Sequence, residues 1–175
     1  GLNLIVFEQK PEALKSLGIE TNEIFARDVF LSPEGATVFP VLSQVNLSSW
    51  QGNGTLAPHR QAPAPSTEET VASPLWHWTN MNMISSYPAR RPSSGNFKVL
   101  MACGMDLLYS PLFELESGKG RIIFSQLEIS GRENEPAAAR IFADLINYAA
   151  STSPVRQEQK MSVIAEKAED KKFVE

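Results

Sequence analysis

The hydrophobic pattern at the start of the chain predicts a strand, a tight turn and a short helix. Residues 4–7 are almost all apolar, which is typical of a strand buried on both faces in the middle of a parallel sheet. In the KPEALKSLG segment that follows, Pro11 suits a first helical turn and Gly18 suits a helix end. Leu14 and Leu17 mark one apolar face. This order of elements is half of a βαβ unit.

The middle of the chain shows little helical periodicity. Residues 25–31 are apolar enough to form another strand. From there to about Pro92 the sequence is rich in Pro, Gly, Ser and Asn, and its lowest complexity lies at 57–74. Pro63 and Pro65 favour an extended, exposed conformation in that segment. We therefore expect a long irregular loop that leaves the sheet here.

Regular patterns return in the second half of the chain. Apolar runs at 97–103 and 107–116 predict strands, and the SGKG turn at 117–120 joins the second of them to a third run at 121–129. These last two runs read as a β-hairpin. A helix is expected next, because six apolar residues recur at helical spacing and form one stripe. They are Ala138, Ile141, Phe142, Leu145, Ile146 and Ala149.

These patterns predict an α/β fold, with a mainly parallel sheet, flanking helices and a distal antiparallel hairpin. A chain of 175 residues is long enough for one domain with a sizeable core. We expect that domain to cover residues 1–152. Residues 153–175 are rich in charge and read as a tail, or as the start of a following unit.

Composition limits the classes of partner and cofactor. The formal net charge of −4 argues against a nucleic-acid partner, since such proteins usually carry a basic excess. The apolar runs are too short to span a membrane, and no signal peptide pattern opens the chain, so we expect a soluble protein. One cysteine and two histidines leave little for a metal site. We therefore expect no metal and no cofactor.

Few residues have the chemistry of a catalytic group. Cys103 is the only thiol, and a thiol hydrolase would pair it with His77 or His59. However, a strand rather than a helix is expected after Cys103, which favours a buried structural cysteine. Glu114 and Glu116 share one face of a predicted strand, and with no partner group nearby we read them as a solvated face.

Three tryptophans lie in the irregular middle of the chain. Trp50, Trp76 and Trp78 could stack on sugar rings, with Asn80 or Asn82 supplying hydrogen bonds. This pattern suits a carbohydrate-binding module with exposed tryptophans. We favour the other interpretation, in which the tryptophans are buried beneath the long loop.

Three stretches carry a resemblance to a known family: NLSSWQGNGTL, WHWTN and SPLFELESGKGRIIFSQLEISGR. Together with the order of the predicted elements, they resemble the class I glutamine amidotransferase-like fold, which is flavodoxin-like. More specifically, they are similar to an accessory version of it found in large bacterial glycoside-hydrolase-like proteins, related to the β-galactosidase trimerisation domain. The resemblance covers about residues 2–150, and it implies that the N-terminal half of the fold is missing here.

The resemblance also implies that the chain is not catalytic. Active amidotransferases place a cysteine nucleophile after the strand that matches residues 4–7, and Phe7 stands at that position here. The family's histidine and glutamate positions hold Glu128 and Ser130. With all three catalytic positions replaced, the resemblance points to a fold without the activity.

The expected function is therefore that of a non-catalytic accessory or assembly domain in a larger, carbohydrate-active bacterial protein. A half-sheet would expose an apolar edge, which soluble proteins avoid. We expect flanking domains of a longer polypeptide, or a second copy in a homo-oligomer, to cover that edge. As part of such a protein, the chain could also lie outside the cytoplasm, and the compartment stays open.

A ligand site, if one exists, is expected where the strands end. Open α/β sheets bind ligands beyond the carboxyl ends of their strands. This rule selects residues 7–10 and 130–134. The polar candidates there are Glu8, Glu128 and Arg132.

Overall fold

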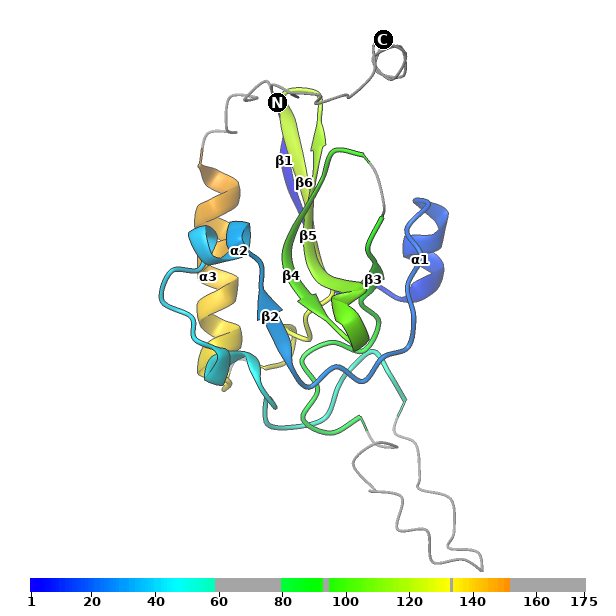
Figure 1. Ribbon diagram of the computed structural model, residues 1–175, viewed down its shortest axis with the longest axis vertical. Helices are drawn as coiled ribbons and strands as arrows, with labels where there is room; N and C mark the ends of the chain where they lie inside the picture. Colours follow the sequence, from blue (N-terminus) through cyan, green and yellow to red (C-terminus); the bar gives the residue numbers. More distant parts are fainter. Residues whose placement is uncertain (59–79, 93–94, 133, 152–175) are drawn as a thin grey trace, which may run out of the picture.

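The computed structural model describes residues 1–58, 80–92, 95–132 and 134–151 (Figure 1). Residues 59–79 and 152–175 lie outside these ranges. They include most of the predicted proline-rich loop and all of the predicted charged tail. In chain order the elements are β1 (Asn3–Val6), α1 (Pro11–Ser16), β2 (Val29–Leu31), α2 (Pro33–Val38), η1 (Gln44–Leu47), β3 (Ala89–Arg90), β4 (Phe97–Cys103), η3 (Met105–Leu107), β5 (Tyr109–Ser117), β6 (Gly120–Ser125) and α3 (Pro136–Ala150).

The sheet is mixed and mostly antiparallel, so the predicted mainly parallel, flavodoxin-like fold is wrong. Its strand order is β1-β6-β5-β4-β2, and β3 pairs with β5. Of the described pairs, only β1 with β6 is parallel. The reason lies in the connections. A parallel pair needs a crossover of about a dozen residues or more, whereas β4, β5 and β6 follow one another through short links.

The predicted β-hairpin is confirmed as β5 and β6. Phe113 pairs with Phe124, and Ser117 pairs with Gly120, so only two residues form the turn. Gly118 takes a φ of +59° at the first turn position, which favours glycine in a two-residue hairpin turn. The antiparallel register follows from this short connection.

Helix α1 forms where the proline and glycine predicted it. Pro11 occupies its first turn. At its end the N–H of Gly18 donates to the carbonyl of Lys15, and the N–H of Ile19 donates to that of Leu14, each at 3.0 Å. This is a Schellman motif, which satisfies carbonyls that the helix leaves free.

Helix α3 is confirmed, but its apolar stripe is only partly buried. Ile141 and Leu145 are fully buried. Phe142 and Ile146, predicted on the same stripe, are 45% and 44% exposed. The stripe is wider than the part of the sheet that α3 covers, so these two side chains lie at its margin. Phe142 stacks there on Phe7, with ring centroids 5.4 Å apart.

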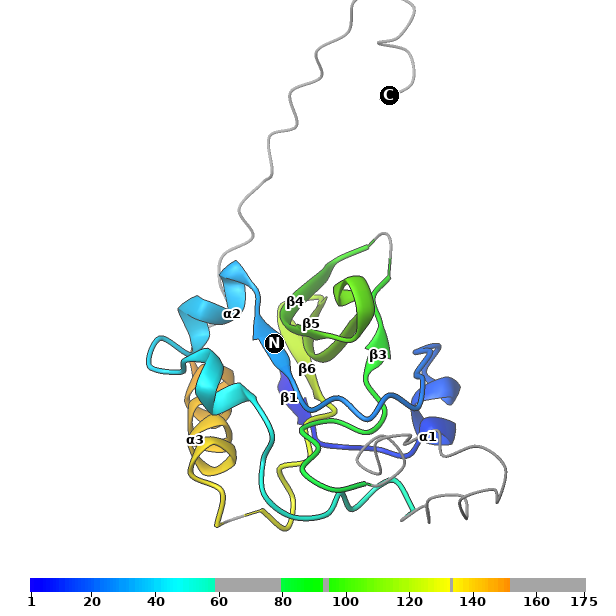
Figure 2. The same ribbon diagram turned by 60° about the horizontal axis from the view of Figure 1, so that its bottom comes forward.

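Helices lie on both faces of the sheet, and the two layers differ in size. Figures 1 and 2 show α2 and α3 on one side of the sheet and α1 on the other. The larger core lies under α2 and α3 and includes Val29, Phe39, Leu100 and Ile141. The smaller core consists of four buried residues: Leu14, Ala89, Phe113 and Phe124.

The segment between α2 and the undescribed 59–79 range forms a cover over the larger core. Phe39, Leu47 and Trp50 from this segment are buried. The predicted strand at 25–31 is shorter than expected, since only β2 (Val29–Leu31) pairs as a strand. Within the described ranges, no helix has the length and apolar character to cross a membrane.

Candidate functional site

The two segments predicted to hold a ligand site lie side by side. Because β1 and β6 are parallel neighbours, the two strands end next to each other on the same side of the sheet. There Glu8 Oε1 accepts a hydrogen bond from the backbone N–H of Ser130 at 2.5 Å. The Gln126 side chain accepts from the backbone N–H of Gln9 at 2.8 Å and donates to its carbonyl at 3.0 Å. The ends of the two strands are therefore tied together by side chains.

Glu128 is a structural hydrogen-bond acceptor. It is fully buried. Its Oε2 accepts from the backbone N–H of Thr55 at 2.7 Å and from the Thr55 hydroxyl at 2.9 Å, while its Oε1 accepts from Ser86 Oγ. A Cβ on Gly54 would lie 3.1 Å from Glu128 Oε1 and 2.5 Å from Met83 Cε, so no space remains beside this carboxylate. Glu128 holds two loops in place and has no room for a substrate.

Arg132 clamps the loop that precedes residue 53. It is 5% exposed, and its Nη1 donates to the carbonyls of Trp50 at 3.0 Å and Gln51 at 2.9 Å. Burial lowers the pKa of Arg132, while the nearby carboxylates of Glu128 and Glu135 act in the opposite direction. The guanidinium therefore orients backbone carbonyls of the loop.

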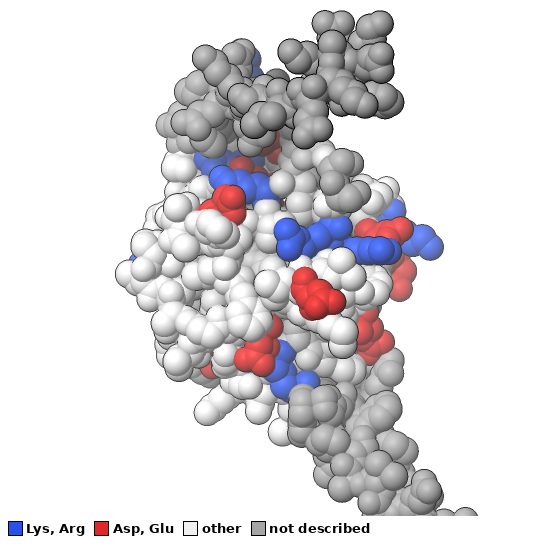
Figure 3. All heavy atoms as spheres, viewed as in Figure 1, with Lys and Arg blue, Asp and Glu red and all other residues white. Residues whose placement is uncertain are grey.

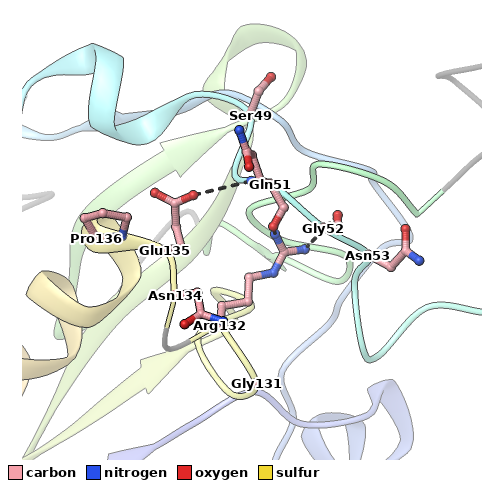
Figure 4. Close-up of a pocket in the computed structure, with 9 residues that line it drawn as sticks. All are labelled: Ser49, Gln51, Gly52, Asn53, Gly131, Arg132, Asn134, Glu135 and Pro136. Atoms are coloured by element: carbon pink, nitrogen blue, oxygen red, sulfur yellow. Dashed lines mark hydrogen bonds between the residues drawn. The ribbon is translucent and has the colours of Figure 1, made fainter.

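A pocket of about 520 Å³ opens between this loop and the start of α3 (Figure 4). The walls are formed by residues of the 49–53 segment on one side and by residues 131, 132 and 134–136 on the other. Glu135 accepts a hydrogen bond from the Gln51 backbone N–H at 3.4 Å and joins the two walls. The lining residues are Ser49, Gln51, Gly52, Asn53, Gly131, Arg132, Asn134, Glu135 and Pro136.

Of the three polar candidates, only Arg132 lines this pocket. Glu8 and Glu128 hold the neighbouring backbone instead. The amide side chains of Gln51, Asn53 and Asn134 were missed by sequence reasoning. For Gln51 and Asn53 a usable signal was present, because no Lys, Arg, Asp or Glu occurs from Gly35 to Pro58. Figure 3 shows the segment after α2 as an area almost free of charged groups.

The geometry around Cys103 does not suit thiol catalysis. The side chain is fully buried at the end of β4. Burial raises the pKa of the Cys103 thiol to about 12, so it stays protonated and is a poor nucleophile near neutral pH. The histidines proposed to activate it, His59 and His77, lie outside the described residues.

Trp50 cannot act as the exposed stacking platform that one hypothesis requires. It is 1% exposed, and its Nε1 donates to the Asn46 carbonyl at 2.8 Å. Asn80 is also buried, where its Nδ2 donates to the carbonyls of Gly54 and Ala57. Trp76 and Trp78 lie outside the described residues. Asn82 Oδ1 accepts from the Gly52 N–H at 3.3 Å.

The interpretation of Glu114 as a solvated residue is wrong. Glu114 and Arg121 are each 1% exposed and form an ion pair at 3.6 Å. The Tyr148 hydroxyl donates to Glu114 Oε2 at 2.6 Å, and the Arg121 guanidinium lies over the Tyr148 ring at 4.4 Å from its centroid. Burial raises the pKa of Tyr148, and its hydrogen bond to Glu114 adds to this shift. This buried cluster fastens α3 to the sheet.

Among the described residues β1 is an end strand of the sheet, and exposed apolar residues lie around it. β1 ends the strand order of the sheet, with β6 as its neighbour on one side. On the strand and just before it, Leu4 and Leu2 are 44% and 79% exposed. Phe142 of α3 is exposed beside it, since it stacks on Phe7 directly after the strand, and the exposed Ile146 lies about one turn further along α3. We call Leu2, Leu4, Phe142 and Ile146 with this edge the β1 edge surface.

Comparisons with known proteins add no relative to this picture. No protein-family model, no curated protein and no solved structure matches the chain. Within the described ranges, no group of His, Cys, Asp and Glu side chains is arranged to hold a metal ion. Function must therefore be argued from the residues and their geometry.

Proposed function

We propose that the chain is a non-catalytic assembly domain that joins two copies of a larger protein through the β1 edge surface. In this arrangement β1 pairs with β1 of a second copy about a twofold axis, and one sheet continues across the interface. The observation that carries the proposal is the position of β1 at the end of the strand order of the described residues, with exposed apolar side chains around it.

The exposed groups are those that such pairing would bury. An unpaired strand edge presents backbone N–H and C=O groups that can template pairing with another chain, and proteins usually guard such edges with charge or proline. β1 reads Asn-Leu-Ile-Val and has neither guard. Because β1 has only four residues, we expect a weak dimer whose population depends on concentration.

The chemistry of the candidate catalytic residues supports a non-catalytic role. The positions that match the amidotransferase residues hold Phe7, which stacks on Phe142, and Glu128, which is buried among hydrogen-bond donors. Ser130 donates its backbone N–H to Glu8. The larger protein in this proposal is a carbohydrate-active bacterial protein. This part of the proposal is supported by the sequence stretches that resemble accessory domains of glycoside-hydrolase-like proteins.

The proposal is tested by measuring the mass of the chain in solution by light scattering over a range of concentrations. We expect the mass to rise above 19.3 kDa as the concentration increases. Leu4→Lys places a charge on the edge, so this variant should stay monomeric. Met105→Lys is the matched control, because Met105 is 84% exposed on η3 and should not affect the dimer.

Two outcomes would refute pairing through this edge. One is a mass of 19.3 kDa at every concentration. The other is a dimer that Leu4→Lys leaves as stable as the dimer of Met105→Lys. Circular dichroism of both variants confirms that each is folded before its mass is compared.

A further inference from the structure

The pocket between the 49–53 and 131–136 segments holds side-chain amides that have no partner. Gln51, Asn53 and Asn134 line it and are exposed. Within the described part of the chain, none of these three amide groups makes a hydrogen bond. Each amide offers two N–H donors and a carbonyl acceptor. The pocket thus presents uncharged donors and acceptors from both of its walls.

The two charged residues in the described lining of the pocket have opposite signs. Arg132 and Glu135 are the charged residues among the described lining. The Arg132 Nη1 donates to two backbone carbonyls, and the Glu135 carboxylate accepts from the Gln51 N–H. The remaining wall, 49–53, belongs to the uncharged run from Gly35 to Pro58. Among the described lining residues, neither sign of charge is in excess.

This balance argues against both ionic classes of ligand. The N-terminus of α3 would attract an anion, but the Glu135 carboxylate stands at that N-cap and repels one. Divalent-cation sites usually combine several carboxylates with neutral oxygen ligands, and Glu135 is the single carboxylate among the described lining residues. A flat apolar ligand needs aromatic or aliphatic walls, whereas amides, a hydroxyl and glycines form most of this lining.

We propose that this pocket binds a neutral saccharide unit through the amides of Gln51, Asn53 and Asn134. Sugar hydroxyls both donate and accept hydrogen bonds, so they can pair with both the N–H donors and the carbonyl acceptor of a side-chain amide. The volume of about 520 Å³ falls within the roughly 300–1,000 Å³ that is typical of small-molecule pockets. Arg132 acts as a positioning residue, since it fixes the carbonyls of residues 50 and 51 and so the loop that carries two of the amides.

The site is independent of the β1 edge surface. It requires no exposed tryptophan, so the burial of Trp50 does not affect it. If the chain is monomeric and binds saccharides, the proposed assembly through β1 is refuted and the saccharide site is not. If the chain forms the dimer and binds no saccharide, the saccharide site is refuted and the assembly is not.

Titration of the ¹⁵N-labelled chain, followed by NMR, tests the proposal. The probes are the methyl glycosides of glucose, galactose, mannose and N-acetylglucosamine, each added separately, with inorganic phosphate as the anionic comparison. We expect at least one glycoside to shift the side-chain NH₂ signals of Gln51, Asn53 and Asn134 in a saturable way. Phosphate should leave these signals in place.

Variants then connect the binding to the amides. Asn53→Ala and Asn134→Ala should each weaken the glycoside affinity about threefold to tenfold, the effect of losing one hydrogen bond or two. Asn147→Ala is the matched control, because Asn147 is exposed on α3 and does not line the pocket. The proposal is overturned if no glycoside shifts the three NH₂ signals, if phosphate shifts them instead, or if both variants bind as tightly as Asn147→Ala.

Discussion

At the scale of single residues, burial decides the role of each side chain with reactive chemistry. The sequence shows Cys103, Trp50 and Glu114 as possible functional groups, and the structure buries all three. Sequence alone could not give this result for Glu114. Its neighbour two positions on, Glu116, has the same strand periodicity but is exposed, because the cover provided by Tyr148 ends between them. Which carboxylate is covered depends on where α3 lies.

The pKa of Cys103 predicts how stability changes at alkaline pH. In the unfolded chain the thiol ionises above its ordinary value of 9.0, whereas in the folded chain it stays protonated up to about pH 12. Between these values the unfolded state binds fewer protons, so the free energy of unfolding falls by up to roughly 1.4 kcal/mol per pH unit. Below pH 9 this contribution to stability is fully present.

Urea unfolding of the native chain and of Cys103→Ala between pH 8 and pH 11 measures this slope. We expect the variant to be less stable at neutral pH, because the small side chain leaves a gap in the core. Its stability should nevertheless fall less steeply above pH 9. Tyr148, whose pKa is also raised, is present in both proteins and cancels in the difference. Equal slopes in the two proteins would contradict the assignment.

At the scale of elements, local signals were reliable and pairing direction was not. The hairpin turn at Gly118 and the proline and glycine that bound α1 were readable from the sequence, because each acts within a few residues. The continuous apolar run at 4–7 correctly indicated a strand. The further inference from this run, a mainly parallel sheet, was wrong. The predicted position in the middle of a sheet is wrong, because β1 is an end strand of the described sheet, is only partly buried and has one parallel partner, β6. The direction of the other strands follows from loop lengths.

The buried pair of Glu114 and Arg121 predicts a large penalty for removing one partner. Glu114→Gln leaves the buried Arg121 guanidinium without this carboxylate, which should destabilise the chain by about 3–5 kcal/mol. Replacing both residues, as in Glu114→Gln with Arg121→Met, should recover part of that loss, since neither buried charge of this pair then remains. Urea unfolding of each variant provides the free energies.

Glu116→Gln is the matched control for this pair, because Glu116 is exposed on the same strand. It should change the free energy of unfolding by less than about 0.5 kcal/mol. If Glu114→Gln costs no more than Glu116→Gln, the pair does not fasten α3 to the sheet.

At the scale of the whole molecule, the two faces of the sheet are covered unequally. The face under α2 and α3 holds the larger core, and the 15-residue helix α3 is also held there by the Glu114 cluster. The opposite face has the six-residue helix α1, anchored by Leu14 on a core of four buried residues. Helices this short have little stability of their own, so α1 depends on that one anchor.

This asymmetry predicts that α1 opens before the rest of the molecule. In native-state hydrogen exchange, the amides of Gly18 and Ile19, which donate to carbonyls of α1, should exchange with a lower opening free energy than those of β5 and β6. Leu14→Ala should lower that local value further, because Leu14 is fully buried on this face. If Gly18 and Ile19 instead open with the same free energy as β5, α1 unfolds only together with the sheet. The smaller core would then be part of one cooperative unit, and Leu14→Ala would destabilise β5 and α1 equally.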